Sequence, residues 1–109
     1  MIERGAIFVA SEKGVLTSKP RPVLIVQNDV ANAIHTTVTA CLVSSALTGK
    51  SSFRVPLLPS GENGLESPSE VQVDRIVSYR RESLDALIGH LSSDDMRRVG
   101  AALKRWLDL

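Results

Sequence analysis

Cysteine, aromatic residues and long apolar runs are all scarce in this sequence of 109 residues. Cys41 is the only cysteine, so no disulfide can form within the chain, as is usual in a reducing compartment. Aromatic residues make up 4% of the chain, which argues against a nucleic-acid site built on a row of stacking rings. No apolar run approaches the ~18 residues of a membrane-spanning helix, and no signal peptide is visible. These absences predict a cytoplasmic protein that does not enter a membrane.

Motifs for metal or phosphate-loop chemistry are also missing. The two histidines, His35 and His90, are far apart and stand in no ligand motif. The seven glycines are scattered rather than gathered into a phosphate-binding loop. Cys41 lies in an apolar run, where a buried and inert thiol is expected rather than a nucleophile. The sequence therefore predicts no metal and no cofactor.

Charge is nearly balanced over the whole chain, with a formal net charge of +1, but not between its halves. Residues 1–54 carry six Lys/Arg and three Asp/Glu, whereas residues 55–109 carry seven and nine. The net charge gives no strong general attraction to nucleic acid, and any basic surface should come from the first half. The length and the hydrophobic share of 43% predict one globular domain spanning residues 1–109.

The hydrophobic pattern predicts short strands followed by a C-terminal helix. A Ser N-cap and two acids after it mark the start of that helix at Ser92. Trp106, on its apolar face, is interpreted as a core or interface anchor. Together these elements predict an α+β fold, a small and mostly antiparallel β-barrel with a C-terminal helix. The strands are expected at residues 6–10, 23–26, 37–43, 52–58 and 70–79, a short helix at 82–87 that Gly89 ends, and a very short strand at 90–91.

The segment from Lys19 to Asp29 is the most distinctive part of the chain: Lys-Pro-Arg-Pro-Val-Leu-Ile-Val-Gln-Asn-Asp. Its apolar centre predicts a strand buried on both faces. Pro20 and Pro22 flank Arg21 and hold its backbone extended, because the residue before a proline avoids the α region. This arrangement predicts a guanidinium at the mouth of a core strand. Alone, such an arginine is most simply a solvated charge or half of an ion pair.

The run Arg-Pro-Val-Leu-Ile-Val, however, resembles the signature of the MazF/PemK family, toxins of toxin–antitoxin pairs that cut single-stranded RNA. The Arg4-Gly5 opening, the hydroxyl residues after the third strand and the later Val-Gln-Val-Asp-Arg-Ile extend the resemblance over nearly the whole chain. It implies the fold of CcdB and MazF, a small antiparallel SH3-like β-barrel with a C-terminal helix. It also implies a homodimer, and an antitoxin whose acidic, disordered C-terminal tail fills the RNA groove.

The resemblance also implies site residues. Arg21 matches the family's catalytic arginine, and Ser44 takes the place of a Thr that helps to hold the scissile phosphate. Asp74 matches a catalytic Asp of another branch, but Gln72 stands where that branch has an Arg and residues 11–18 lack its His, so the chain is closer to the MazF branch. The residues expected to bind RNA are Lys19, Pro22, Ser45, Lys13 and Lys50.

The chemistry of RNA cleavage suits these residues. The 2′-hydroxyl can attack the adjacent phosphorus and expel the 5′-oxygen, leaving a 2′,3′-cyclic phosphate without a metal. The protein then has to position the reacting groups and stabilise charge on the phosphoryl oxygens. The guanidinium of Arg21 offers two parallel donors to phosphate, and Ser44 would donate a further hydrogen bond. Asp74, or a group that the sequence does not identify, would serve as the base.

Two other functions stay open at this stage. A toxin that poisons DNA gyrase shares the fold, but its activity depends on a C-terminal Trp-Gly-Ile-type ending, of which this chain has only Trp106. An inactive relative kept as a regulator is the other, since Ser44 replaces Thr and Ala6 replaces an acid. The specificity for an RNA sequence is expected to come from residues 11–18 and 47–51.

Overall fold

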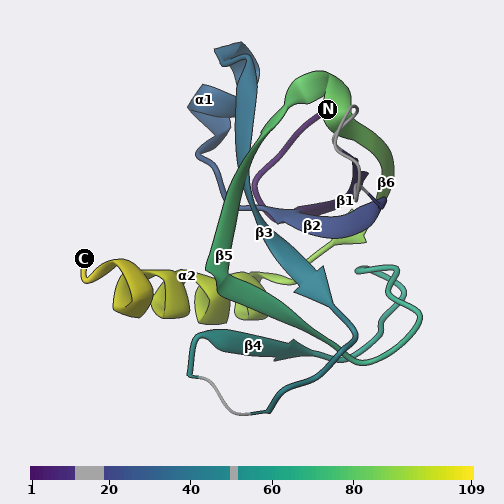
Figure 1. Cartoon of the computed structure of the whole chain (residues 1–109), viewed down its shortest axis with the longest axis vertical. Coiled ribbons are helices and arrows are strands. Elements are labelled where there is room, and N and C mark those ends of the chain that lie inside the picture. Colours follow the sequence, from purple (N-terminus) through teal and green to yellow (C-terminus); the bar gives the residue numbers. More distant parts are fainter. Residues whose placement is uncertain (12–18, 50–51) are drawn as a thin grey trace.

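A computed structural model describes residues 1–11, 19–49 and 52–109, which form a bent six-stranded sheet with a long helix packed against it (Figure 1). Neighbouring strands are antiparallel throughout, in the order β4-β5-β3-β2-β1-β6. Within the described residues, β4 and β6 are the two edges, so the sheet stays open between them instead of closing into a barrel. The elements are β1 (Ala6–Ala10), β2 (Arg21–Ile25), α1 (Asp29–Ile34), β3 (Thr37–Ser44), β4 (Arg54–Leu57), β5 (Ser69–Arg80), η1 (Arg81–Ser83), β6 (Leu84–His90) and α2 (Ser93–Leu107).

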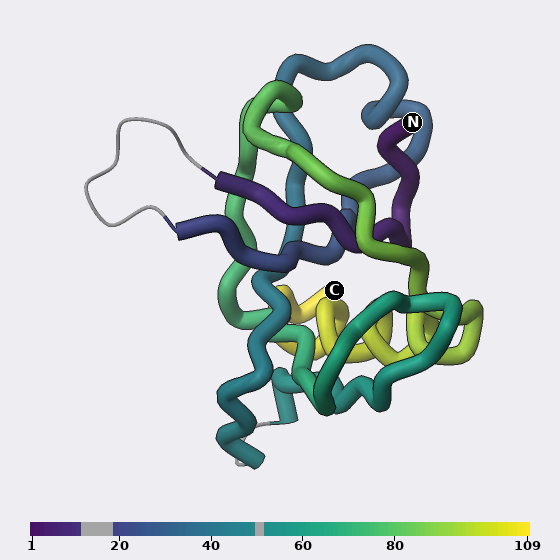
Figure 2. The backbone as a smooth tube through the Cα atoms, turned by 90° about the vertical axis from the view of Figure 1, so that its right-hand side faces the viewer, coloured from purple at the N-terminus to yellow at the C-terminus, as the bar shows by residue number. Residues whose placement is uncertain are grey.

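Strand β2 is buried on both faces, as its uninterrupted apolar run predicts. Leu24 belongs to a core cluster that α2 covers with Val99, whereas Val23 and Ile25 belong to a second cluster on the other side of the sheet. Figure 2 shows β1 and β2 side by side above α2. Cys41 is fully buried in the first cluster, and burial raises the pKa of its thiol to about 12. The thiol is therefore inert at neutral pH, in agreement with the expectation from sequence.

Strand β5 is interrupted by a bulge that bends it sharply (Figure 1). Cys41 of β3 pairs with Ile76, but the next residue, Leu42, pairs with Gln72. Residues 73–75 therefore have no partner on β3, and such extra residues bend the strand and re-aim its side chains. Asp74 lies in this bulge.

Two segments differ from the expectation. Residues 29–34, which lie largely in the stretch 30–36 interpreted as a connection, form α1, because Asn28 caps the helix by accepting a hydrogen bond from Val30 N. Residues 82–87, expected as a short helix, instead lie in η1 and β6, and β6 pairs with β1. The prediction of a helix there was wrong because backbone hydrogen bonds to the open edge of β1 outweigh the local spacing of leucines.

Helix α2 begins as predicted, with the Ser92 hydroxyl accepting a hydrogen bond from Asp95 N at 3.1 Å. Val99 and Ala102 are fully buried against the sheet. Trp106 is half-exposed and packs edge-to-face on Phe53, with ring centroids 5.0 Å apart. Among the described helices, none has both the length and the apolar character to cross a membrane.

Candidate active site

The sheet register brings Arg21 and Ser44 together. Val23 of β2 pairs with Leu42 of β3, so the same antiparallel register continued by two residues places Arg21 opposite Ser44. Arg21 is the first residue of β2 and Ser44 is the last residue of β3. Both line one cavity of about 400 Å³, within the range of about 300–1,000 Å³ that is usual for ligand sites.

Three segments form the walls of this cavity. Residues 20–22 at the start of β2 form one wall, and residues 43–45 at the end of β3 form the second. The third wall comes from the turn-rich segment after β4, for which the sequence predicted no role. Ile88 of β6 completes the lining. The described residues that line the cavity are Pro20, Arg21, Pro22, Val43, Ser44, Ser45, Gly64, Leu65, Glu66, Ser67, Ser69 and Ile88.

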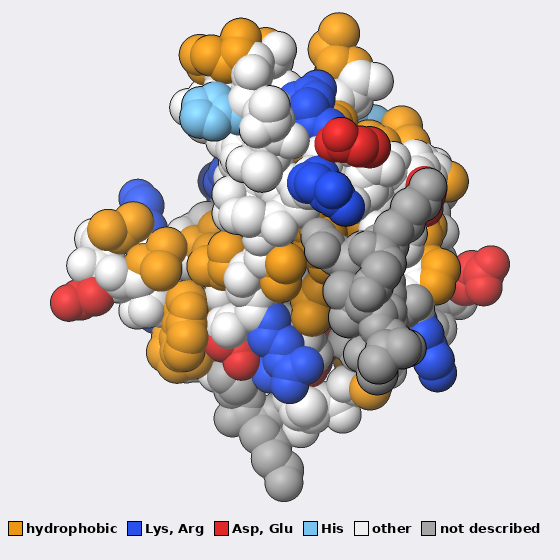
Figure 3. Space-filling model, turned by 45° about the horizontal axis from the view of Figure 1, so that its top comes forward, with side chains coloured by type: hydrophobic (Ala, Val, Ile, Leu, Met, Phe, Trp, Pro, Cys, Tyr) orange, Lys and Arg blue, Asp and Glu red, His pale blue; other side chains and the backbone are white. Residues whose placement is uncertain are grey.

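The side chain of Arg21 is exposed and available to a ligand. Within the described part of the chain, its guanidinium makes no hydrogen bond and no ion pair, so the simpler reading as half of an ion pair has no support there. A guanidinium carries five N–H donors in a fixed fork, a geometry that suits the binding of an anion. Figure 3 shows one face of the molecule, on which positive and negative side chains of the described residues are interspersed, in keeping with the near-neutral net charge.

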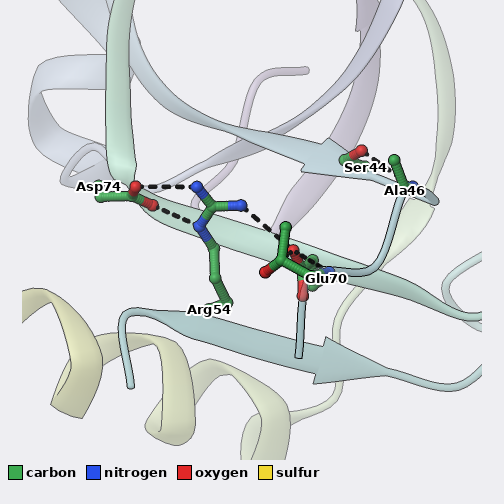
Figure 4. A network of polar contacts seen from close by, with 6 residues as sticks. Ser44, Ala46, Arg54, Glu70 and Asp74 are labelled. Carbon is green, nitrogen blue, oxygen red and sulfur yellow. Dashed lines mark hydrogen bonds and ion pairs between the residues drawn. The ribbon is translucent and has the colours of Figure 1, made fainter. Parts of the chain in front are cut away.

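The hydroxyl of Ser44 is oriented by its own turn (Figure 4). Its Oγ accepts a hydrogen bond from the backbone N–H of Ala46 at 3.1 Å. Since that bond uses an oxygen lone pair, the hydroxyl proton stays free to be donated. Ser44 can thus donate to a bound oxygen from a fixed position at the end of β3.

Of the other residues predicted to bind RNA, two line the cavity and one lies outside its lining. Pro22 and Ser45 line the cavity with Arg21. Lys19 is exposed two residues before Arg21 but is not part of the lining. Lys13 and Lys50 lie outside the described residues.

The third wall is a loop whose shape depends on Asn63. This side chain is 3% exposed; it donates to Leu58 O at 2.8 Å and accepts from Ser60 N and Leu65 N, both at 3.0 Å. Gly64 follows with φ +68°, and a Cβ at that position would lie 2.3 Å from the carbonyl oxygen of Ile88. Only glycine fits there, so the loop is held closely against β6.

Asp74, the third predicted catalytic residue, does not line this cavity. It forms a bidentate ion pair with Arg54, with Nε–Oδ1 at 2.7 Å and Nη2–Oδ2 at 2.9 Å (Figure 4). Hydrogen bonds from Arg54 hold the pKa of the Asp74 carboxyl below its ordinary value. Arg54 also contacts Glu70 at 3.2 Å. Sequence reasoning missed Arg54, because only the pairing of β4 with β5 brings these charges together.

Known proteins resemble this chain along its whole length. The probable endoribonuclease MazF of Mycolicibacterium smegmatis is 33% identical over 108 residues, covering 99% of this chain and 98% of that protein. The solved structure of the Mycobacterium tuberculosis toxin MazF-mt6 superposes with a TM-score of 0.81 at 28% identity, covering 95% and 97% of the two chains. A mycobacterial endoribonuclease solved in complex with its cognate antitoxin has a TM-score of 0.84 at 21% identity, covering 100% and 97%, and shows the same fold.

The family described as PemK-like, MazF-like toxins of type II toxin–antitoxin systems matches residues 3–107. The resemblance that the Arg21 run and the strand around Asp74 suggested is thereby confirmed. The fold that it implied is present as well, as an antiparallel sheet with a C-terminal helix. This chain belongs to the PemK-like, MazF-like toxin family of type II toxin–antitoxin systems.

Proposed function

We propose that this toxin is an endoribonuclease that cuts single-stranded RNA, with the scissile phosphate bound in the cavity between Arg21 and Ser44. The observation that carries the proposal is the placement of both side chains at facing strand ends of one cavity. Family membership and the names of the endoribonuclease relatives support the same activity. These names do not favour the gyrase poison.

The reaction needs no covalent intermediate with the protein. The RNA 2′-hydroxyl gives up its proton to solvent water as its oxygen forms a bond to phosphorus. The bond to the 5′-oxygen breaks and that oxygen takes up a proton, giving a 2′,3′-cyclic phosphate and a 5′-hydroxyl. Arg21 would bind two phosphoryl oxygens with its fork of donors and assist protonation of the leaving 5′-oxygen. Ser44 would donate a hydrogen bond to a phosphoryl oxygen. Both groups act by position and charge, which requires a fixed geometry rather than a metal.

Asp74 remains the base predicted from the sequence, but the geometry supports a different role. Both of its carboxylate oxygens accept hydrogen bonds from Arg54, and it lies outside the lining of the cavity. To accept the 2′ proton it would have to exchange a bidentate ion pair for a substrate. We therefore propose that Arg21 and Ser44 carry the chemistry and that Asp74 supports the sheet beneath them.

Binding of RNA and of protein partners completes the proposal. Pro22 and Ser45 would contact the nucleotides beside the scissile phosphate, and Lys19 would attract the backbone next to them. The mycobacterial endoribonuclease solved with its cognate antitoxin supports an antitoxin as partner here. We propose that its acidic tail competes with RNA for Arg21, and that the toxin acts as a homodimer.

Incubation of the purified protein with a pool of RNA oligonucleotides in EDTA tests the activity. We expect cleavage with 2′,3′-cyclic phosphate ends, and a rate at least about 100-fold lower for Arg21→Ala, as is typical when a donor to transition-state charge is removed. Arg80→Ala is the matched control, because Arg80 is also an exposed arginine on a strand but does not line the cavity.

Equal rates for the wild type and Arg21→Ala would remove Arg21 from catalysis. Absence of cleavage by the wild type, across the whole RNA pool, would identify an inactive relative. Inhibition of gyrase supercoiling without RNA cleavage would instead identify a gyrase poison.

A further inference from the structure

We infer that Glu70, acting through Thr48, is a positioning residue that holds the turn containing Ser44 at the Arg21 cavity. The inference rests on the proposed ribonuclease function. Glu70 does not line the Arg21 cavity. In this proposal it affects RNA cleavage only by fixing the position of the Ser44 hydroxyl.

Glu70 has a buried carboxylate, and three hydrogen-bond donors converge on one of its oxygens. Its side chain is 4% exposed, and it lies opposite Ser44 in the pairing of β3 with β5. One oxygen, Oε1, accepts from Thr48 N at 3.3 Å and from Thr48 Oγ1 at 3.1 Å. The same oxygen accepts from Arg54 Nη1 at 3.2 Å. A buried carboxylate is costly unless it is paired in this way.

The turn after β3 is thus fixed at two points. Ala46 donates to the Ser44 hydroxyl, and Thr48 bonds back to Glu70 with both its backbone N–H and its side chain. Only Leu47 separates Ala46 from Thr48, so a shift of one is expected to shift the other. If Thr48 is released, the Ala46 N–H that orients the Ser44 hydroxyl is expected to move as well.

Arg54 links the Glu70 anchor to the Asp74 carboxylate. Arg54 gives two donors to Asp74 in the β5 bulge and a third to Glu70 (Figure 4). All three donors converge on Oε1, where an amide would still offer an acceptor oxygen but without the negative charge that favours Arg54 beside it. The carboxylate thus connects the ion pairs of the sheet to the turn at the cavity.

Thr48→Val tests this inference most cleanly, because it removes the hydroxyl donor and keeps the backbone N–H and the side-chain shape. We expect the cleavage rate at saturating RNA to fall about 10-fold with KM unchanged, as a small misplacement of a group that contacts the phosphate would cause. Thr48→Ser restores the hydroxyl and should return the rate to within about 2-fold of the wild type. Thr37→Val, a matched change at an exposed strand residue outside the cavity lining, should have no effect.

A double-mutant cycle separates positioning from general loosening of the fold. If Thr48 acts through Ser44, Thr48→Val should lower the rate by less than about 2-fold in a Ser44→Ala background, because the group that it positions is gone. Full additivity of the two changes would overturn the inference, as would an unchanged rate in Thr48→Val alone.

Amide hydrogen exchange supplies a readout that does not depend on cleavage. In Thr48→Val, the N–H of Ala46 should exchange about 10-fold faster, with core amides such as that of Leu24 unchanged. If the wild type cuts no RNA, the proposed function fails. An unchanged rate of Ala46 exchange would overturn the inference whether or not RNA is cut.

Discussion

Arg21 begins β2 and Ser44 ends β3, two neighbouring antiparallel strands, and both residues line the same cavity. The backbone pairing of Val23 with Leu42, two residues away from each, keeps these strand ends side by side. Groups held on the rigid elements of a fold keep a more exact geometry than groups on loops. The prolines on either side of Arg21 add to this rigidity by restricting the backbone where the strand begins.

The first prediction concerns the shape of the Arg21 head group. Arg21→Lys keeps the positive charge but replaces a planar fork by a single ammonium, which cannot bind two phosphoryl oxygens in parallel. We expect kcat for RNA cleavage to fall about 10²-fold, with a melting temperature within about 2 °C of the wild type, because an exposed side chain without partners in the described chain contributes little to stability. Single-turnover kinetics and thermal unfolding would measure both.

Arg80→Lys serves as the control for that substitution. A rate for Arg21→Lys within about 3-fold of the wild type would mean that charge alone suffices, and that the fork geometry plays no part.

The second prediction concerns Asp74 and Arg54. Since the pKa of the Asp74 carboxyl is lowered on folding, the ion pair contributes stability above the ordinary value near 3.8 and loses it as the pH falls through the lower, folded value. Asp74→Asn should therefore reduce the free energy of unfolding by about 1–2 kcal/mol at pH 7. The difference between the two proteins should shrink once the pH drops below about 4.

Urea unfolding at pH 7 and pH 3 checks this dependence. The same variant should keep most of its RNA cleavage at pH 7 if Asp74 supports the sheet. A loss of activity without a loss of stability would restore Asp74 as the catalytic base that the sequence suggests.

The local sequence was enough to predict β2 and α2 but not β6. Apolar residues bounded by breakers predicted the first, and a Ser N-cap with helical periodicity predicted the second. Leu84, Leu87 and Ile88 have helical spacing, yet they lie in a strand whose register to β1 shifts twice, between Ile7 and Phe8 and between Phe8 and Ala10. Such irregularities destroy the period of two that identifies a strand.

Some parts of the candidate site could likewise be predicted from local sequence, and others depend on tertiary packing. The local pattern predicted the strand ends at which Arg21 and Ser44 stand, and the structure brings both residues to one cavity. Their role in catalysis was implied by the family resemblance and stays a prediction. The partner of Asp74 could not be predicted, because Arg54 is 20 residues away and reaches it only through the β4–β5 register and the bulge. The wall that includes Gly64, in a loop held by the Asn63 side chain, is likewise a property of how that loop packs on β6, which no local pattern encodes.

The third prediction concerns that wall. Gly64→Ala combines a left-handed backbone with a Cβ that would lie 2.3 Å from Ile88 O. Gly49→Ala is a matched control, because Gly49 has φ +63° but a Cβ there would meet no atom of the described residues within 4 Å. Left-handed strain of about 1–2 kcal/mol is common to both, so Gly64→Ala should cost about 1–3 kcal/mol more in stability, the usual cost of overpacking. Equal costs in denaturant unfolding would mean that the loop moves away from β6 freely.

The fourth prediction concerns the outer edge of β4. Phe53 O accepts a hydrogen bond from Val73 N of β5, so the alternate residues of β4 turn their backbone groups outward. Pro56 is one of these, and it has no N–H to offer to another strand. Two arginines of α2 cover carbonyl oxygens on this side: Arg98 donates to Pro56 O at 2.8 Å, and Arg105 donates to O of Ser52, just before β4, at 3.0 Å.

The double variant Arg98→Ala/Arg105→Ala leaves this edge open to pairing with another chain, and such edges promote association. We expect species larger than those of the wild type in sedimentation velocity, increasing with protein concentration. Arg97→Ala/Lys104→Ala removes the same charge from α2 without touching β4, and it should sediment like the wild type. If both variants associate equally, the loss of net charge is responsible and the arginines do not protect the edge.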